Sequence, residues 1–98
     1  MVYLKMKLFK VNNIYKSPIK HKKYRVSLVH KRNGTVRTMD FGGDPKRYEH
    51  FKDKTPIKLY SHLDHNDKVR RRSYKKRHQI HIKKGYYSPS FFSMKYLW

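Results

Sequence analysis

The clearest pattern of hydrophobic and polar positions is a pair of short runs rich in β-branched and aromatic residues, residues 24–30 (YRVSLVH) and 35–41 (TVRTMDF). Such runs favour β-strands. The residues between them, 31–34 (KRNG), include Asn-Gly, which is typical of a type I′ turn because that turn needs positive φ at both central residues. The pattern therefore predicts a β-hairpin over about residues 24–41.

The N-terminal segment also alternates, since Leu4, Met6 and Leu8 are separated by lysines. This alternation predicts a half-buried strand over residues 2–11. We expect the strand to end at Asn12-Asn13, because asparagine pairs are typical of turns.

The lysine-rich segment 15–23 (YKSPIKHKK) contains a proline and predicts an extended basic arm, with a solvated loop as the alternative. Two parts of the chain are therefore expected. Residues 1–23 form an N-terminal strand and basic arm, and residues 24–98 form a small α+β domain with an aromatic C-terminal tail.

Two helices are predicted in the second half of the chain. Residues 68–78 (KVRRRSYKKRH) contain no Gly or Pro, and Asp67 is a favourable N-cap before them. Ser88 and Pro89 are typical of the N-cap and first residue of a short terminal helix. The expected fold class is therefore α+β: a small single domain with a β-hairpin (about 24–41), a short basic helix (about 68–78), an extended N-terminal strand or arm, and a short aromatic C-terminal helix.

Between the hairpin and the basic helix, the sequence predicts mostly irregular structure. Asp44 followed by Pro45 indicates a single helical turn within residues 44–51. Thr55 precedes a proline, which favours an extended backbone there. A short strand or extended run is expected next, over residues 57–60.

The chain is strongly basic: 26 Lys and Arg oppose 6 Asp and Glu, a formal net charge of +20. All the acidic residues lie within residues 40–67, so the segments on either side carry only positive charge. Such a chain repels itself, and a permanently acidic partner, either nucleic acid or an acidic protein surface, explains the balance. The cations expected to contact this partner are Lys20, Lys22, Lys23, Lys68, Arg70, Arg71, Arg72, Lys75, Lys76 and Arg77.

Aromatic residues make up 15% of the chain, too many for a solvated tail. The candidates for a protein interface are Phe91, Phe92, Tyr96, Leu97 and Trp98; the alternative is that they pack onto the hairpin, since the core of a small chain needs its aromatics. Without cysteine the chain forms no disulfide or thiolate metal site and suits a reducing compartment. Its apolar runs are too short for a signal peptide or membrane span, and neither is expected.

Histidine gives the main hint of chemistry, in the pairs His62/His65 and His78/His81. Structural zinc sites nearly always include thiolates, so we predict no metal and no cofactor. The His65-Asn66 pair and the nearby acids invite comparison with a metal-dependent His-Asn-His nuclease, but their order along the chain is wrong. A Ser or Cys nucleophile with a matched base is also missing. The sequence therefore predicts no catalytic residues, no small-molecule substrate and no enzyme.

A series of motifs within residues 24–98 carries a resemblance. After the hairpin come Phe41-Gly42, residues 48–51 (YEHF), residues 60–67 (YSHLDHND), Arg71, Tyr74, Arg77-His78 and the ending Tyr96-Leu97-Trp98. This order resembles a family of small basic proteins encoded by large nucleocytoplasmic DNA viruses, with distant relatives in tailed phages. The doubled glycine 42–43, the insert at residues 48–59 and the N-terminal strand depart from the shortest relatives. The resemblance implies a virion-associated protein rather than a particular mechanism.

Three functions are compatible with these observations. The leading hypothesis is a non-enzymatic minor capsid protein of a large DNA virus particle, made in the infected host cell and located in the virion. It would bridge neighbouring capsid proteins through its basic arms and aromatic terminus. The alternatives are a nucleic-acid-binding genome-packaging protein of the virion interior and a component of a ribonucleoprotein such as the ribosome. Charge does not decide whether the acidic partner is protein, DNA or RNA.

Overall fold

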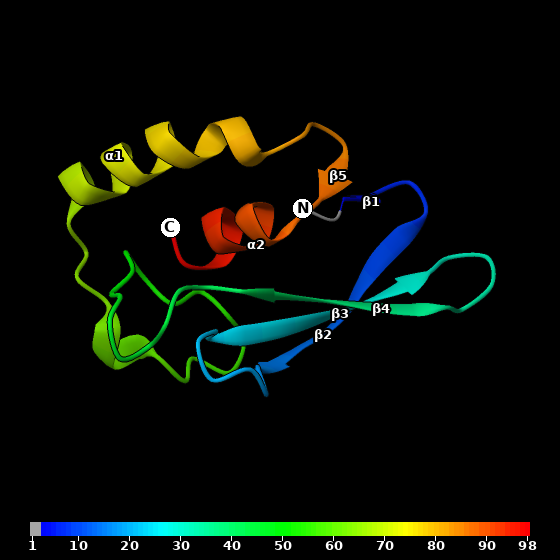
Figure 1. Cartoon of the computed structure of the whole chain (residues 1–98), viewed down its shortest axis with the longest axis horizontal. Coiled ribbons are helices and arrows are strands. Elements are labelled where there is room, and N and C mark those ends of the chain that lie inside the picture. Colours follow the sequence, from blue (N-terminus) through cyan, green and yellow to red (C-terminus); the bar gives the residue numbers. More distant parts are fainter. Residues whose placement is uncertain (1–2) are drawn as a thin grey trace.

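The fold is organised around β3 (Tyr24–His30), the central strand of a three-stranded antiparallel sheet in a computed structural model that describes residues 3–98. β3 pairs with β2 (Phe9–Lys16) on one side and with β4 (Val36–Phe41) on the other (Figure 1). Two helices lie on the same side of this sheet. The expectation of a small α+β domain is confirmed.

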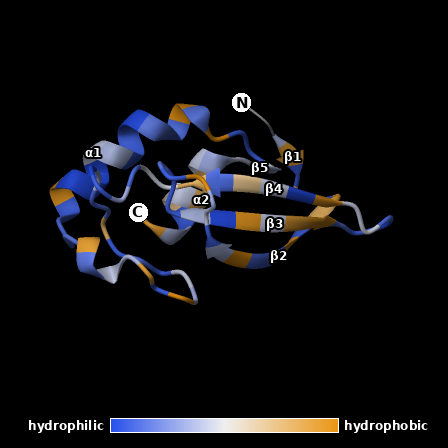
Figure 2. Cartoon of the chain, turned by 60° about the horizontal axis from the view of Figure 1, so that its bottom comes forward, coloured by the Kyte–Doolittle hydropathy of each residue, from blue (hydrophilic) through white to orange (hydrophobic). Residues whose placement is uncertain are grey.

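The predicted hairpin is formed by β3 and β4. Tyr24, Val26 and Leu28 are fully buried on one face of β3, as strand alternation requires. Tyr24 lies opposite Phe41 and Val26 lies opposite Met39, so the buried face continues across both strands. Figure 2 shows hydrophobic residues recurring along β2 and β3.

The prediction of a type I′ turn in the hairpin is wrong. The amide of Gly34 donates to the carbonyl of His30 (3.0 Å), and the amide of His30 donates to the carbonyl of Thr35 (2.8 Å). All four residues 31–34 therefore lie in the loop, and of these only Gly34 has positive φ (73°). Asn33 instead uses its side-chain oxygen to accept from the amide of Thr35 (2.9 Å), a role that asparagine commonly has in turns.

The N-terminal prediction is also wrong in its details. The expected strand over residues 2–11, whose first residue lies outside the described part, is divided by a turn at residues 6–8. Before the turn, β1 (Leu4–Lys5) pairs with β5 (Tyr86–Tyr87). After the turn, β2 continues through Asn12-Asn13, and a β-bulge there shifts the register of its pairing with β3.

The division into residues 1–23 and 24–98 does not match the structure. The pairing of β2 with β3 makes residues 9–16 an integral part of the main sheet rather than an arm. Only the short turn at residues 17–23 connects the two strands, and Ser17 is fixed there by donating to Asp40 Oδ1 (2.6 Å). The described residues therefore form a single domain.

Helix α2 (Pro89–Tyr96) packs against the sheet as the second layer. Its N-cap is Ser88, as predicted, whose hydroxyl accepts from the amide of Phe91 (3.2 Å). Phe92 is fully buried, with its ring centroid 5.7 Å from that of Phe41 on β4. In Figure 1, α2 lies between the sheet and the outer helix α1 (Lys68–His78), whose bounds match the prediction.

The irregular segment 42–67 is held by buried polar groups as well as by backbone hydrogen bonds, among them the isolated bridge between His50 and Asp64. Its centre is Asp53, 1% exposed, whose Oδ1 accepts from the amide (2.9 Å) and hydroxyl (2.6 Å) of Thr55. Its Oδ2 accepts from the Tyr24 hydroxyl and from the amide of Tyr60 (3.2 Å). One aspartate therefore fastens this segment to the central strand.

The local predictions for this segment were partly right. The helical turn after Asp44 forms, since Asp44 Oδ1 accepts from the amide of Lys46 (2.9 Å) and its carbonyl from that of Tyr48 (2.8 Å). The strand expected at residues 57–60 does not form, because Lys58 has a φ of 47° and the chain turns there. No helix within residues 3–98 is long and apolar enough to span a bilayer.

Candidate functional site

Helix α1 carries the densest group of cations and has no buried residue. Asp67 caps it by accepting from the amides of Val69 (2.9 Å) and Arg70 (3.1 Å). Like charges at i, i+4 spacing destabilise such a helix, and short helices are marginal alone. Its position therefore depends on the few side chains that join it to the rest of the domain.

The inner face of α1 is attached through aromatic stacking. The ring of Tyr74 stacks on Trp98, with centroids 4.0 Å apart, and on His78, with centroids 4.1 Å apart. Burial and the neighbouring Arg77 guanidinium lower the pKa of His78 below its ordinary value, which favours the neutral ring. Arg71 also faces inward, since its Nε donates to the carbonyl of Trp98 (2.7 Å). Arg71, expected to contact a partner, thus serves the attachment of the helix.

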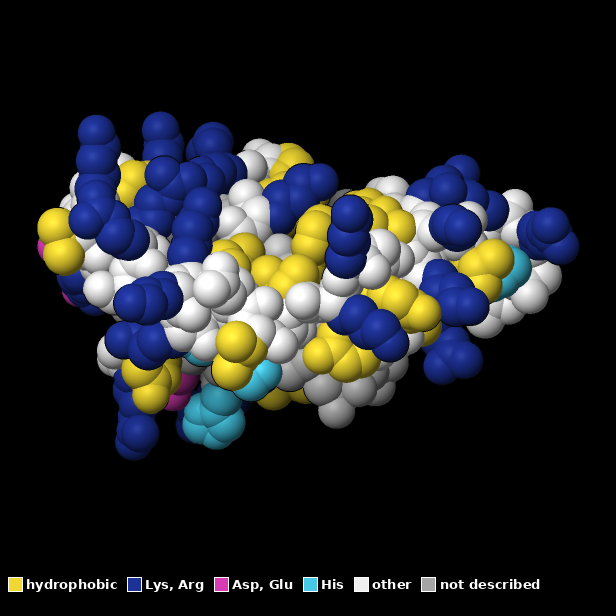
Figure 3. All heavy atoms as spheres, turned by 90° about the horizontal axis from the view of Figure 1, so that it is seen from above, with side chains coloured by type: hydrophobic (Ala, Val, Ile, Leu, Met, Phe, Trp, Pro, Cys, Tyr) yellow, Lys and Arg dark blue, Asp and Glu magenta, His cyan; other side chains and the backbone are white. Residues whose placement is uncertain are grey.

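The outer face of α1 presents Lys68, Arg72 and Lys76, all exposed. None of the three takes part in the four ion pairs found among the described residues. Figure 3 shows Lys and Arg side chains gathered over this helix. These three predicted cations are therefore available to an external anion, whereas Lys75 is half-buried.

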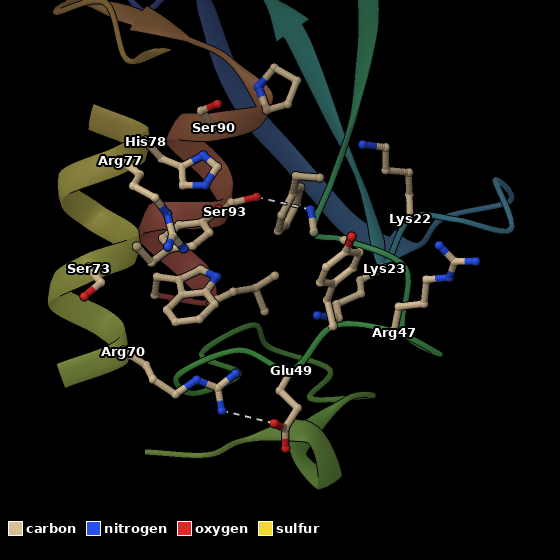
Figure 4. Close-up of a pocket in the computed structure, with 18 of the residues that line it drawn as sticks. Lys22, Lys23, Arg47, Glu49, Arg70, Ser73, Arg77, His78, Ser90 and Ser93 are labelled. Atoms are coloured by element: carbon tan, nitrogen blue, oxygen red, sulfur yellow. Dashed lines mark hydrogen bonds and ion pairs between the residues drawn. The ribbon is translucent and has the colours of Figure 1, made fainter. Parts of the chain in front are cut away.

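A third face of α1 borders a cleft of about 850 Å³, which we call the basic cleft. Arg70, Ser73 and Arg77 line it from α1, while Lys22 and Arg47 line it from two connecting segments (Figure 4). Its other lining residues include Lys23, Gly42, Gly43, Tyr48, Glu49, His78, Ser93 and Trp98. Two segments of the chain that are distant in sequence thus add cations to those of the helix.

One carboxylate lies at the basic cleft. Glu49 Oε1 accepts from Arg70 Nη1 at 3.1 Å, and both side chains are about half exposed. Solvent screens such a pair, so it contributes little to stability and leaves Arg70 able to exchange partners. Together with Lys22, Arg47 and Arg77, Arg70 keeps the cleft positive in sign.

Two glycines shape the wall of the cleft. Gly42 has a φ of 84°, and a Cβ there would lie 2.9 Å from Lys23 Cβ. A Cβ on Gly43 would lie 2.8 Å from Cδ2 of the Tyr48 ring. Both positions need glycine because neighbouring side chains occupy the space. The doubled glycine was the sequence signal for this close packing, although the sequence suggested only the end of a strand.

Lys23 does not match its prediction as a surface cation. It is 1% exposed, although it lines the basic cleft. Burial lowers its pKa to about 8, even though the carboxylates of Asp53, Asp44 and Asp64 act in the opposite direction. None of these carboxylates lies within ion-pair distance of Lys23 among the described residues.

Replacing Lys23 by methionine is expected to stabilise the free protein by about 1 to 3 kcal/mol at pH 7, because a poorly compensated buried charge is removed. The lowered pKa means that the unfolded chain binds more protons than the folded chain between pH 8 and 10.5, so this group's contribution to stability rises with pH over that range. Urea unfolding at pH 7 and pH 9 measures both effects. Lys20→Met, at an exposed position of the same turn, is the control and should change neither value.

The remaining predicted residues are placed as follows. Lys20 is exposed but does not line the cleft. Phe92, Leu97 and Trp98 are 0%, 1% and 9% exposed within the domain's own core, and Phe91 and Tyr96 are half-buried against it. Of the two possibilities for the aromatic C-terminus, the structure shows packing within the domain. A protein interface built on these residues would require them to leave the core.

The histidines are dispersed in the structure. His50 is fully buried and its Nε2 donates to Asp64 Oδ1 (2.5 Å), while the Nδ1 of His65 accepts from the amide of Asp67 (2.9 Å). Residues 3–98 contain no group of three or more His, Cys, Asp or Glu side chains that could hold a metal ion. These histidines therefore have structural partners.

Comparisons of the chain with protein-family models, with curated proteins and with solved structures found no match.

Proposed function

We propose that this protein is a non-enzymatic nucleic-acid-binding protein that contacts phosphates through the outer face of α1. The observation that carries the proposal is the separation of its side chains: most of the aromatic residues are packed inside, and exposed cations cover the outer face of one helix. A polyanion neutralised by these cations releases its counterions, which supplies affinity without reading sequence.

The same separation argues against an acidic protein surface as the main partner. The buried centres of protein–protein interfaces are depleted in charged residues, lysine among them, and enriched in aromatics and arginine. Protein–DNA interfaces are more polar and much more positively charged. The exposed cations Lys68, Arg72 and Lys76 are typical of a protein–DNA interface. Phe92 and Trp98, which would suit a protein–protein interface, are buried in the domain.

The biological setting follows from the resemblance to small basic proteins of large nucleocytoplasmic DNA viruses. We propose that the nucleic acid is the viral genome and that the protein acts in the virion interior. A positive charge of +20 on a chain of 98 residues suits the neutralisation of packaged DNA.

A second candidate function is the minor capsid protein, and one observation favours it. Ile57 and Leu59 are 42% and 45% exposed on the irregular segment, which gives a neighbouring protein an apolar contact. In that role the protein would use this loop, rather than its aromatic terminus, to bridge capsid proteins. Loss of virion incorporation in an Ile57→Ser, Leu59→Ser variant that retains DNA binding would support it.

The proposed function predicts a steep salt dependence of duplex DNA binding. In the triple variant Lys68→Gln, Arg72→Gln, Lys76→Gln, the slope of log affinity against log salt should fall by about 2 to 3, because each phosphate contact contributes about 0.9. Fluorescence anisotropy over a series of salt concentrations measures this slope.

The matched control removes three charges at the opposite end of the molecule. Lys31 and Arg32 lie in the exposed loop of the β3–β4 hairpin and Arg37 is the second residue of β4, at the end of the sheet far from α1 (Figure 1). Changing them to glutamine should lower the slope by less than one contact. An equal fall in the salt slope of the two triple variants would contradict a localised interface. A salt slope near zero in the wild type would contradict nucleic-acid binding.

A further inference from the structure

The basic cleft differs from the outer face of α1 because it is a half-open hollow, partly apolar and built from several segments. Its volume of about 850 Å³ lies within the range of pockets that enclose one small organic group. Leu97 and Trp98 supply apolar wall, and Arg70 and Arg77 supply charge. A double helix is too wide to enter such a cleft, whereas a base and phosphate of a single strand fit its size and its mixed chemistry.

The exposed Tyr48 ring gives the cleft a surface on which a base can stack. The side chain is 59% exposed, unusual for an aromatic residue in a chain that buries most of its aromatic rings. Its ring lies directly against Gly43, where a Cβ would come within 2.8 Å of Tyr48 Cδ2. Base stacking on such aromatics contributes about 1 to 3 kcal/mol per base and is typical of proteins that bind single strands.

Tyr48 also lies between two hollows. A second, smaller hollow is lined by Lys22, Arg47 and Tyr48, all three of which also line the basic cleft. Gly43, His21 and Asp44 complete this smaller hollow. Lys22 and Arg47 therefore lie beside the Tyr48 ring, where the phosphates of a strand with a stacked base would meet positive charge.

Lys23 supplies the independent sign that an anion belongs in the cleft. It lines the cleft, is 1% exposed and forms no ion pair among the described residues. A buried ammonium that forms no ion pair is costly, even though Asp53, Asp44 and Asp64 act on it from beyond ion-pair distance. A phosphate oxygen is a partner that would compensate it. The cations around it favour an anion over another cation as the occupant.

We propose that the basic cleft holds one unpaired nucleotide of a single-stranded nucleic acid, with its base stacked on Tyr48 and its phosphate against Lys23, Arg70 and Arg77. This inference rests on the proposed nucleic-acid-binding function and adds a preference for single strands. Arg70 releases Glu49 when the phosphate binds. Because stacking does not read the base, the preference is for strandedness and not for sequence.

The test compares a fluorescent oligothymidylate with a DNA duplex of the same length, at one salt concentration, for wild type and four variants. Tyr48→Ala should weaken binding of the single strand about tenfold and change duplex binding less than about twofold. Tyr15→Ala removes a tyrosine that is 37% exposed outside the cleft, and it should change neither affinity.

The other two variants separate the cleft from the helix surface. Lys23→Met should weaken single-strand binding about tenfold although it stabilises the fold, so unfolding does not explain the loss. Arg72→Gln, on the outer face of α1, should weaken both affinities by the same factor.

The outcomes distinguish the two proposals. Salt-dependent duplex binding without any selective effect of Tyr48→Ala or Lys23→Met would overturn the cleft assignment and leave the proposed function intact. Absence of binding to both nucleic acids would overturn both. A polyglutamate peptide that binds wild type and loses its affinity in Tyr48→Ala to the same extent as the oligonucleotide would assign the cleft to an acidic protein segment instead.

Discussion

Replacing Asp53 by alanine is expected to cost about 3 kcal/mol or more of the free energy of unfolding, enough to leave a domain of this size largely unfolded. The carboxylate is 1% exposed and accepts four hydrogen bonds, two from Thr55, one from the Tyr24 hydroxyl and one from the Tyr60 amide. Alanine leaves all four donors without a partner in a place that water does not reach. Each buried unsatisfied donor costs about 1 to 3 kcal/mol.

Urea unfolding followed by the fluorescence of Trp98, the chain's single tryptophan, measures this loss. Tyr24→Phe removes one of the four donors and should cost much less. Asp67→Ala removes an exposed helix cap and should cost about 1 kcal/mol. If Asp53→Ala cost no more than Asp67→Ala, the buried network would not be what holds the irregular segment.

Asp53 also gives the protein a defined acid sensitivity. Burial by itself would raise its pKa, but hydrogen bonds from Thr55, Tyr24 and Tyr60 outweigh this effect and hold the pKa below 3.8. A lowered folded pKa means that the stabilisation is complete above pH 3.8 and is lost as the pH falls through the folded value. The melting temperature of wild type should therefore drop below about pH 4, and that of Asp53→Asn should drop less steeply.

Local sequence signals predicted the elements that are fixed locally. Asp67 and Ser88 accept hydrogen bonds from the first turns of their helices, so the start of each helix is encoded in three or four adjacent residues. The N-terminal region behaves differently, because the alternation of residues 4–8 continues through a turn that contains no Gly or Pro. The pairing of β2 with β3 then carries the strand across Asn12-Asn13, which is a tertiary effect that local propensity does not contain.

The candidate site was predictable in its charge but not in its geometry. Composition identified the cations of α1, yet Arg71 and Arg72 are neighbours in sequence and have opposite fates, one against Trp98 and the other in solvent. The basic cleft escaped prediction because it forms only when Lys22 and Arg47 are brought to α1 by the fold. Asp53 escaped as well, since an aspartate in a lysine-rich loop gives no sign that it is buried.

Trp98 connects stability to function, and replacing it by alanine is expected to cost about 3 to 5 kcal/mol and to release α1 from the domain. Its ring stacks on Tyr74 at 4.0 Å and nearly parallel, its carbonyl accepts from Arg71 Nε at 2.7 Å, and its ring lies 5.1 Å from that of His65. The helix has no buried residue of its own, and its repelling charges do not sustain it alone.

Circular dichroism of Trp98→Ala should therefore show a larger loss of helical signal than a substitution that only leaves a cavity in the core. Trp98→Phe keeps a ring for Tyr74 to stack on and should retain most of the helix, while Val69→Ala, at a position 67% exposed on α1, should change neither stability nor helicity.

The same variant tests whether a folded α1 is needed for binding. The unfolded segment keeps every cation, so purely nonspecific attraction to duplex DNA should survive in Trp98→Ala, with a salt slope close to that of wild type. The basic cleft, in contrast, loses its wall of Trp98 and the fixed positions of Arg70 and Arg77. Single-strand binding should therefore fall more than duplex binding; an equal fall in both would mean that charge, and not the arrangement of charge, determines what this protein binds.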